Sequence, residues 1–325
     1  MRLRPPIGIV GAGAWGTALA YGISKRHPVV LYCHIPKERR DIQRILHKKK
    51  ARVEVTCDLH QIFHACQIII MAAPFQVMSS WFRTQRKQHD LSKHIWINAS
   101  KGISADTLQL FPHMIPRHLK YGVLSGPSFA AELIQGQPTS LVFASQNQTL
   151  CHTIQKEFSH SFLRIYIQTD PIGVSVGGAL KNVLAIGSGM AHGLGLQTNS
   201  ISALVTRGIW ELARLTSLLG GESKTIFGLS GLGDILLSCY SEKSRNMRFG
   251  KWVGQGLSPR QALKKVGSTV EGYSTTEAIY KIILKKKVDA PICTEVYRVL
   301  FQHKNPKRSI QDLMNRSLKQ EIFPT

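Results

Sequence analysis

The sequence of 325 residues has few acidic residues and few of the patterns that define a metal-binding or membrane protein. Only 19 Asp and Glu stand against 42 Lys and Arg, which gives a formal net charge of +23. The six cysteines lie far apart with no C-x-x-C pair, which favours buried thiols in a reducing compartment over a zinc site or a disulfide framework. Outside the opening stretch, no apolar run approaches the roughly 18 residues that cross a bilayer. We therefore predict a globular protein with no metal and no transmembrane segment.

The excess of basic residues is compatible with binding to nucleic acid or to an anionic membrane surface. The basic residues, however, form short scattered runs at 37–40, 48–50, 285–287 and 304–308. No aromatic-interleaved stripe, zinc-finger pattern or sustained basic helix accompanies them. We therefore expect a generally basic surface that attracts small phosphorylated molecules, and no specific nucleic-acid site.

The two halves of the chain differ in their pattern of apolar residues. In the first half, short β-rich apolar segments alternate with longer polar segments such as 37–49, which is typical of a helix. Strands are predicted over residues 7–10, 29–33, 68–72, 94–98 and 122–124. This alternation predicts an α/β fold, a doubly wound Rossmann-type parallel sheet covered on both faces.

From about residue 171 the strand signals nearly vanish and long helical segments replace them, as at 179–190 and 200–218. We therefore predict an α/β domain over residues 1–170 and an all-α domain over residues 171–325. The tail after Lys304 is polar, and we expect it to fray.

The opening stretch, IGIVGAGAWGTALA at 7–20, has two interpretations. A basic start (Arg2 and Arg4), an apolar run and a small-residue end resemble a secretory signal. The same letters give a strand, a G-x-G-x-x-G turn at Gly11, Gly13 and Gly16, and a helix, followed by a second strand. In such a turn the glycines permit the tight bend, the approach of a pyrophosphate and helix–strand packing, while the helix N-terminus binds the phosphates. A signal core would contain leucines rather than repeated glycines, so we favour a dinucleotide-binding domain.

The residue after the second strand influences the choice of cofactor. An Asp or Glu there would bind the ribose hydroxyls of NAD, but this sequence has His34, with Lys37, Arg39 and Arg40 close behind. No carboxylate repels a 2′-phosphate at that first position, so we hypothesise that NADP is accepted, with its preference over NAD left open. The alternative is that the three cations form a solvated helix start.

Two charged residues stand alone in apolar segments. Lys181 is the one Lys, Arg, Asp or Glu between residues 171 and 206, and Asp234 the one between 225 and 241. Either could be a snorkelling or capping residue without chemistry. A lysine at a water-poor site near other cations, however, has a lowered pKa and can exchange protons with a substrate. We therefore favour a catalytic role for this pair.

Further polar residues follow the predicted strands and the Asp234 segment. Lys101 comes directly after strand 94–98, and the small-residue stretch SGPSFA at 125–130 follows another strand. Ligands bind at the carboxyl ends of parallel strands, although a surface loop lysine is the commoner fate of such a residue. Arg245, in the triplet Ser-Arg-Asn at 244–246, has a guanidinium group whose donors match phosphate oxygens.

As an ordered set, these motifs are similar to those of a known family. GAGAWGTALA, KGI, LSGPSFAAEL, GALKN, GLSGLGD, SRN and VEGYST occur in this order between residue 7 and about residue 300. The chain resembles the NAD(P)-dependent glycerol-3-phosphate dehydrogenases of the bacterial type. The GALKN and GLGD…SRN blocks are specific to that family, whereas the opening glycine motif is not.

The resemblance implies reversible hydride transfer between nicotinamide C4 and C2 of dihydroxyacetone phosphate, which gives sn-glycerol 3-phosphate. It implies NADP or NAD as cofactor, a role in phospholipid synthesis, a cytoplasmic location and a homodimer. Lys181 would be the proton donor and acceptor at the C2 oxygen. The implied substrate-binding residues are Lys101, Gly126, Ser128, Lys181, Asp234, Ser244, Arg245 and Asn246, with Ser238 as a further hydroxyl near the phosphate. The implied cofactor-binding residues are Gly11, Gly13, Ala14, Trp15, Gly16, His34, Lys101, Ala130, Arg245, Thr269 and Glu271.

Two segments depart from the family pattern. The region 46–58 lacks the usual N-x-x-(Y/F)-L-P sequence, and Pro74 is followed by Phe75 where a small hydroxyl residue is usual. Both lie near the expected cofactor site, so cofactor affinity is in question. Two rival functions stay open: another β-hydroxyacid-type NADP dehydrogenase, and a non-catalytic dinucleotide-binding protein with a polyanion-binding surface.

Overall fold

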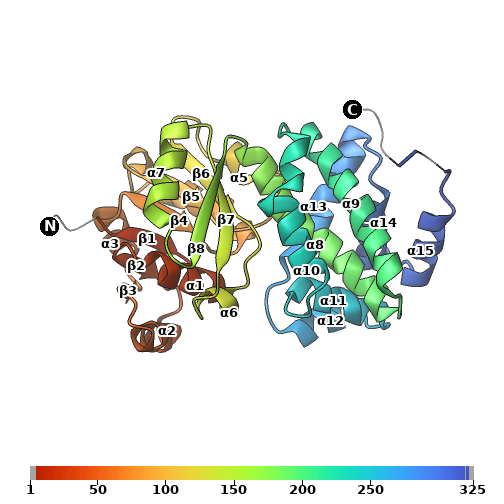
Figure 1. The fold of residues 1–325 in the computed structure, drawn as a ribbon, viewed down its shortest axis with the longest axis horizontal. Coiled ribbons are helices and arrows are strands. Elements are labelled where there is room, and N and C mark those ends of the chain that lie inside the picture. Colours follow the sequence, from red (N-terminus) through yellow and green to blue (C-terminus); the bar gives the residue numbers. More distant parts are fainter. Residues whose placement is uncertain (1–4, 319, 322–325) are drawn as a thin grey trace.

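The computed structural model describes residues 5–318 and 320–321, which form a sheet domain and a helical domain side by side (Figure 1). The basic start at Arg2 and Arg4 lies outside the described residues. The sheet has the strand order β3-β2-β1-β4-β5-β6-β7-β8. Its strands are β1 (Ile7–Val10), β2 (Val29–Tyr32), β3 (Val53–Thr56), β4 (Ile68–Met71), β5 (Ile95–Asn98), β6 (Lys120–Ser125), β7 (Thr139–Ala144) and β8 (Leu163–Gln168).

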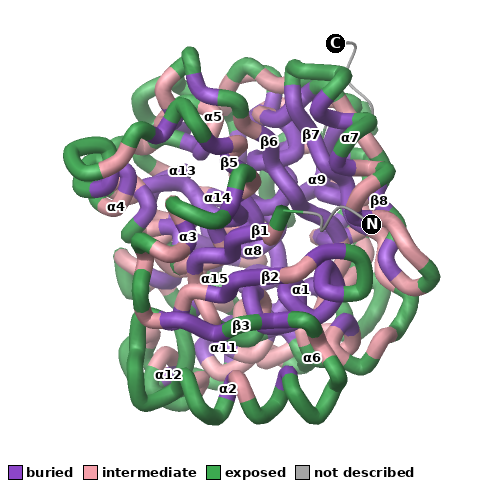
Figure 2. The backbone as a smooth tube through the Cα atoms, turned by 90° about the vertical axis from the view of Figure 1, so that its left-hand side faces the viewer, coloured by how far each residue is buried: buried purple, intermediate pink, exposed green. Residues whose placement is uncertain are grey.

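The predicted fold class is confirmed, because helices cover both faces of a mostly parallel sheet. One face packs on α1 (Ala14–Ile23), α2 (Pro36–Lys48), α6 (Ala130–Leu133) and α7 (Gln148–Phe158). The other face packs on α3 (Leu59–Ala65), α4 (Met78–Gln85) and α5 (Phe111–Met114), with short 3₁₀ turns η1 (Phe75–Val77) and η2 (Leu91–Lys93) nearby. Figure 2 shows the strands buried at the centre and the outer helix α2 largely exposed.

All five predicted strands are present, with ends shifted by a few residues, whereas β3, β7 and β8 were not predicted. The first six strands are parallel, but β7 runs antiparallel to β6 and β8 runs parallel to β7. This pairing is the departure from the expected parallel sheet. Its local cause is the connection from Ser125 to Thr139, which holds one short helix, α6, and returns the chain directly alongside β6.

The helical domain is organised around α8 (Pro171–Gly193). The helices that pack around α8 are α9 (Thr198–Leu218), α10 (Asp234–Cys239), α11 (Arg245–Gly254), α13 (Glu271–Lys286) and α14 (Pro291–Phe301). The domain also contains α12 (Pro259–Val266) and the short turns η3 (Ser223–Phe227) and η4 (Leu229–Gly233). By length and composition α8 could cross a membrane, yet 89% of its apolar window is buried inside the protein. Burial of that kind identifies α8 as the core helix of this domain.

Glycines bring the backbones of α8 and α11 into contact. A Cβ placed on Gly189 would lie 2.1 Å from the Met247 carbonyl oxygen, and a Cβ on Gly250 would lie 2.1 Å from the Ile186 carbonyl oxygen. Because no side chain larger than hydrogen fits at either position, the glycine-rich composition of α8 follows from packing.

The expectation of a frayed tail is wrong for residues 306–314, which form helix α15 (Pro306–Met314). Asn305 caps this helix by accepting a hydrogen bond from the Lys307 N–H at 2.8 Å. Lys304 forms ion pairs with Glu295 on α14 and with Asp312 on α15, which fasten the helix to the domain.

Candidate active site

The turn between β1 and α1 has the geometry of a pyrophosphate cradle. Gly11 has φ of +114°, and a Cβ on it would lie 2.6 Å from the Ala73 backbone nitrogen. A Cβ on Gly16 would lie 1.8 Å from the Gly11 carbonyl oxygen, so helix and turn are in contact. At Gly13, by contrast, a Cβ would meet no atom of the described residues within 4 Å, and none of their side chains caps α1. The free N–H groups at this helix start therefore fit a dinucleotide phosphate.

Residues predicted to surround the cofactor lie around this turn. Ala14 begins α1 and is exposed, and the Trp15 indole N–H donates to the Ala99 carbonyl at the end of β5 at 3.0 Å. His34 is exposed beyond the end of β2, with Nδ1 3.3 Å from the Tyr32 hydroxyl. The Arg39 Nε donates to the Val55 carbonyl at 2.9 Å, which fixes α2 against β3.

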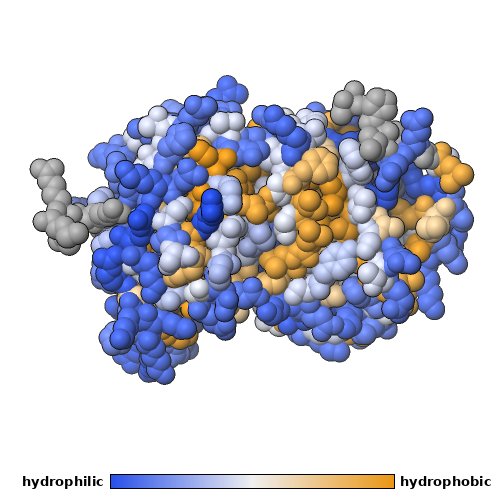
Figure 3. Space-filling view, in the orientation of Figure 1, coloured by the Kyte–Doolittle hydropathy of each residue, from blue (hydrophilic) through white to orange (hydrophobic). Residues whose placement is uncertain are grey.

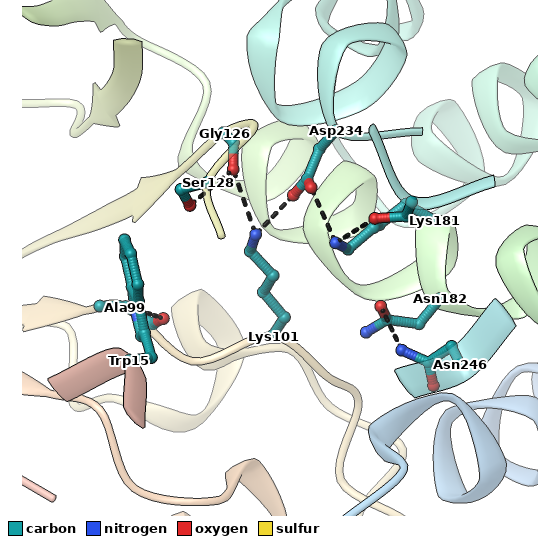
Figure 4. Close-up of polar contacts among 10 residues, drawn as sticks. Trp15, Ala99, Lys101, Gly126, Ser128, Lys181, Asn182, Asp234 and Asn246 are labelled. Carbon is teal, nitrogen blue, oxygen red and sulfur yellow. Dashed lines mark hydrogen bonds and ion pairs between the residues drawn. The ribbon is translucent and has the colours of Figure 1, made fainter. Parts of the chain in front are cut away.

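The centre of the site is a carboxylate that binds two lysines. Lys181 on α8 is 9% exposed, and its Nζ donates to Asp234 Oδ1 and to the Ser238 hydroxyl, each at 2.7 Å (Figure 4). Asp234 is fully buried at the start of α10, directly after the π-helical turn η4. Its other oxygen, Oδ2, accepts from Lys101 Nζ at 2.5 Å. The two lysines come from different domains, so the carboxylate joins the domains where they meet.

The electrostatics of this trio favour proton exchange by Lys181. Burial is the strongest influence and lowers the pKa of Lys181, and the Lys101 ammonium lowers it further. The Asp234 carboxylate acts against both by its charge and its hydrogen bond. A lysine with a lowered pKa loses its proton more readily than a solvated one, as a general acid requires.

Glycines on α8 create the space for this contact between the domains. A Cβ on Gly178 would lie 2.8 Å from the Ser125 hydroxyl at the end of β6 and 3.3 Å from Cγ of Lys101. A Cβ on Gly177 would lie 2.7 Å from the Ser230 carbonyl oxygen in the turn before Asp234. The small residues before Lys181 thus allow the Lys101 stem and the Asp234 segment to approach the helix closely.

The loop after β6 contributes a backbone acceptor. The Gly126 carbonyl accepts from Lys101 Nζ at 3.2 Å and from the Ser128 hydroxyl at 3.1 Å. Gly126 has φ of +133°, a conformation that L side chains rarely adopt. Ala130 begins α6 and is half-buried. The structure therefore brings Gly126 and Ser128 together with Lys101, as the sequence predicts.

The Ser-Arg-Asn triplet has three different environments. The Ser244 side chain caps α11 by accepting from the Met247 N–H at 3.3 Å. Arg245 is exposed and forms no hydrogen bond or ion pair with the rest of the described chain, so its guanidinium group is available to a ligand. The Asn246 amide donates to Asn182 Oδ1 at 2.9 Å, and its oxygen accepts from the Gly272 N–H at 3.0 Å. Asn246 thereby links α8, α11 and α13.

Glu271 begins α13 beside these cations. Burial raises its pKa, whereas Arg245, Lys101 and Lys181 lower it, as does a hydrogen bond from the Phe75 backbone. Thr269, two residues earlier, is exposed. Glu271 therefore lies within electrostatic reach of the catalytic candidates.

Phe75, which departs from the family pattern, is 2% exposed. It packs on Gly102, where a Cβ would lie 2.9 Å from the Phe75 Cβ. Its ring thus belongs to the core, while its backbone faces Glu271.

Sequence reasoning missed two positioning residues. Asn182 is adjacent to Lys181 in the GALKN block and meets Asn246 across the helices. Gln76 donates to the Ile103 carbonyl at 2.9 Å and to the Ser274 hydroxyl at 3.1 Å, and accepts from the Ala105 N–H at 2.9 Å. Asn182 had a signal in its motif, whereas Gln76 lies in a segment with no local pattern.

A glycine cradle for a dinucleotide in one domain, and a buried lysine–aspartate pair in the other, define a two-domain NAD(P)-dependent oxidoreductase. The model for the N-terminus of NAD-dependent glycerol-3-phosphate dehydrogenase matches residues 6–151, and that for the C-terminus matches residues 170–311. The chain belongs to the NAD-dependent glycerol-3-phosphate dehydrogenase family.

The similarity to individual relatives extends over nearly the whole chain. A glycerol-3-phosphate dehydrogenase (NAD(P)+) of Thermoanaerobacter sp. (strain X514) is 36% identical over 97% of this chain and 98% of its own. One from Francisella tularensis subsp. novicida is 37% identical over 96% of this chain and 98% of its own. The crystal structure of glycerol-3-phosphate dehydrogenase from Coxiella burnetii is 30% identical, with a TM-score of 0.90 over 96% of this chain and 99% of that one.

Proposed function

We propose that the protein catalyses the reversible NAD(P)-dependent reduction of dihydroxyacetone phosphate to sn-glycerol 3-phosphate. The observation that carries this proposal is the shared Asp234 carboxylate, which holds Lys181 and Lys101 together beside the exposed Arg245. Lysine charge suits a developing oxyanion, and a free guanidinium suits a phosphate ester. A guanidinium also binds a carboxylate, so the choice between a phosphate ester and an unphosphorylated hydroxyacid rests on the family membership and on the test below.

When bound, the nicotinamide supplies or accepts the hydride at its C4. Lys181 donates its proton to the substrate C2 oxygen during reduction and takes it back during oxidation. The Lys101 charge stabilises the negative oxygen, while Asp234 orients both ammonium groups. Arg245 binds the remote phosphate, which places the carbonyl, and Asn246 holds α11 against α8 and α13 so that Arg245 and Lys181 keep their spacing.

For the cofactor, Gly11, Gly13 and Gly16 would hold the pyrophosphate, and Trp15, Ala130 and Glu271 would line the nicotinamide side. At the ribose end, His34 stands where a carboxylate would bind the ribose of NAD, and the exposed Lys37 and Arg40 follow it, with Glu38 as the one carboxylate in the first turn of α2. Arg39 differs from these two cations, because its Nε donates to the Val55 carbonyl. NADP is accepted in this proposal alongside NAD.

We propose that the sheet domain comprises residues 1–170 and the helical domain residues 171–325. Asp170 caps α8 by accepting from the Gly173 N–H at 2.8 Å, and Pro171 is the first residue of that helix. An Asp–Pro step of this kind starts a helix sharply and marks the end of the sheet domain.

The proposal also includes a cytoplasmic homodimer that serves phospholipid synthesis. Figure 3 shows an apolar area on the helical domain. Large apolar side chains exposed in this domain include Phe227, Leu236 and Tyr240. Exposed apolar surface of this kind is typical of subunit contacts, which supports the dimer.

The test is to mix the protein with dihydroxyacetone phosphate and follow the absorbance of NADPH, then of NADH, with Lys181→Met alongside. We expect turnover by the wild type and a fall in kcat of about 10³-fold in the variant, because a positioned general acid contributes roughly 10²–10⁴-fold. NADPH binding by the variant, measured by fluorescence, should be unchanged. Near-normal turnover by Lys181→Met would refute its role, and turnover only with unphosphorylated hydroxyacids would refute the substrate.

A further inference from the structure

Two cysteines that lie far apart in sequence meet at one edge of the sheet. The parallel register of β2 and β3 ends at the pair Tyr32 and Thr56. The last bond of this ladder runs from the Cys33 N–H to the Thr56 carbonyl at 2.8 Å, and the Asp58 N–H turns back to Thr56 Oγ1. Cys33 and Cys57 therefore each come directly after the last registered pair of these neighbouring strands. Both side chains belong to the apolar cluster on the α1 side of the sheet, so they lie on the same face.

The spacing of this pair suits a disulfide. Neighbouring strands lie about 4.8 Å apart. Disulfides join Cα atoms that are about 4.4–6.8 Å apart. Both cysteines are free thiols in this structure. They also interact electrostatically: burial raises the pKa of Cys33 most, a hydrogen bond to Ile35 lowers it, and the neighbouring Cys57 raises it again.

The two thiols differ in access. Cys57 is half-buried, whereas Cys33 is 1% exposed. The Cys33 thiol donates to the Ile35 carbonyl at 3.2 Å, directly before α2 begins at Pro36. A more exposed thiol beside a buried one is the arrangement in which the first reacts with the oxidant and the second resolves the mixed disulfide.

We propose that Cys33 and Cys57 form a reversible redox-modification site, whose oxidant is a low-molecular-weight disulfide of the glutathione class. Its consequence for cofactor binding rests on the proposed function, because Cys33 directly precedes His34 at the ribose end of the cofactor site.

The reaction consists of two thiol–disulfide exchanges. The Cys57 thiolate attacks one sulfur of oxidised glutathione, a mixed S–S bond forms, the glutathione S–S bond breaks, and one glutathione thiol leaves with a proton. The Cys33 sulfur then attacks Cys57 Sγ, and the second glutathione leaves with the proton of Cys33. Two protein thiols are thereby oxidised by two electrons, and one glutathione disulfide is reduced to two thiols.

Oxidation changes the chain at the start of α2. The disulfide removes the thiol hydrogen that binds the Ile35 carbonyl, and the segment carrying His34 and Lys37 loses that support. We expect NADPH to bind about tenfold more weakly to the oxidised protein, equivalent to the loss of one hydrogen bond to a charged group. Reduction restores the original affinity.

The experiment treats the full-length reduced protein with glutathione disulfide and measures intact mass, the cross-linked peptides after digestion, and NADPH affinity by fluorescence titration. Cys57→Ser and Cys33→Ser remove one partner each. Cys66→Ala is the matched control, because Cys66 is buried in the apolar cluster on the opposite face of the sheet.

The expected result is a loss of two hydrogen atoms and a Cys33–Cys57 peptide in the wild type and in Cys66→Ala. Cys57→Ser should give neither, and Cys33→Ser should stop at the glutathione adduct on Cys57. Absence of the cross-link in the wild type, or a stable adduct on Cys57 alone, would overturn the proposed site. A cross-link without change in NADPH affinity would overturn its link to the cofactor.

Failure of this inference is distinguishable from failure of the proposed function. The mass, the cross-link and NADPH affinity are measured without turnover. A protein that cross-links but does not reduce dihydroxyacetone phosphate refutes the dehydrogenase assignment, whereas one that turns over but never cross-links refutes the redox site.

Discussion

Gly13 and the N-terminus of α1 are left open in the sheet domain, whereas Gly189 and the N-terminus of α14 in the helical domain are in contact with other parts of the protein. In the sheet domain, a Cβ on Gly13 would meet no atom of the described chain within 4 Å, and no described side chain caps the N-terminus of α1. In the helical domain, Gly189 meets a carbonyl oxygen, and the N-terminus of α14 is closed by the buried Glu211 carboxylate, which accepts from the Ile292 and Cys293 N–H groups at 2.7 and 3.1 Å.

This difference teaches how to separate a binding glycine from a packing glycine. The sequence alone does not distinguish Gly13 from Gly189, because each is a glycine in or directly before a helix. The distinction is whether the missing side chain's space is occupied by the protein or left open. Substitutions at the two kinds of position should therefore affect different properties.

The largest effect on stability should come from adding a methyl group at a glycine that is packed against backbone. Gly189→Ala places a methyl group where the Met247 carbonyl oxygen already lies, so α8 and α11 must separate. We expect a loss of about 3 kcal/mol in the free energy of unfolding, at the upper end of overpacking effects. Urea denaturation measures it. An unchanged unfolding midpoint would show that the helix contact is looser than described.

A methyl group at Gly13, where the space is open, should leave stability unchanged and weaken cofactor binding. Gly13→Ala has room for its methyl group and a φ of −65° that alanine adopts, so the fold is retained. The methyl group obstructs approach of the pyrophosphate to the helix start. We expect NADPH affinity to fall about 30-fold, or about 2 kcal/mol, by fluorescence titration. A fall in the unfolding midpoint instead would assign Gly13 to packing.

Glu211, which binds the N-terminus of α14, predicts that the stability of the protein depends on pH. Burial is the strongest influence on Glu211 and raises its pKa to about 7, against the N–H groups of α14 and Arg214, which lower it. Because the folded pKa exceeds the ordinary glutamate pKa of 4.5, this group's contribution to stability is complete below pH 4.5 and is lost as pH rises to about 7.

The slope of unfolding free energy between these pH values should approach about 1.4 kcal/mol per pH unit for one proton. Denaturation of the wild type and of Glu211→Gln at several pH values measures it. The variant cannot ionise and should lose this component of the slope. Parallel curves for the two proteins would contradict the assignment.

The smallest effect is expected at His34, at the ribose end of the proposed cofactor site, and concerns the KM for NADPH. His34→Asp introduces a carboxylate beside a 2′-phosphate, so the KM for NADPH should rise about fivefold, or about 1 kcal/mol, while the KM for NADH changes less. His118→Asp, at another exposed histidine, controls for the change in overall charge. Equal effects of the two variants on NADPH would remove His34 from the cofactor site.

Local patterns in the sequence were sufficient for the strands that are continuously apolar. Ile7–Val10 and Ile68–Met71 are buried on both faces and were predicted nearly to the residue. By contrast, Val53–Thr56 follows a basic run and contains the exposed Glu54, and Leu163–Gln168 alternates buried and exposed residues at the edge of the sheet. Such strands exist because a neighbour pairs with them, and pairing is not a local property.

The candidate site was predictable in its residues but not in its connections. Lys181 and Asp234 stood out as lone charges, and the family resemblance added Lys101, Arg245 and Glu271. That one carboxylate holds both lysines depends on a contact between residues 133 positions apart, from two domains. Likewise, Ser244 has a capping role that follows from where α11 begins, and the Cys33–Cys57 pair depends on strand register.

The sharing of Asp234 makes acid strength a property of the contact between the domains. Lys101 lies on the sheet domain and lowers the pKa of Lys181 on the helical domain. Any rotation that separates the domains withdraws Lys101 and leaves the carboxylate to Lys181 alone, which then holds its proton more tightly. The acid strength of Lys181 is therefore set by residues of both domains and not by the helical domain alone.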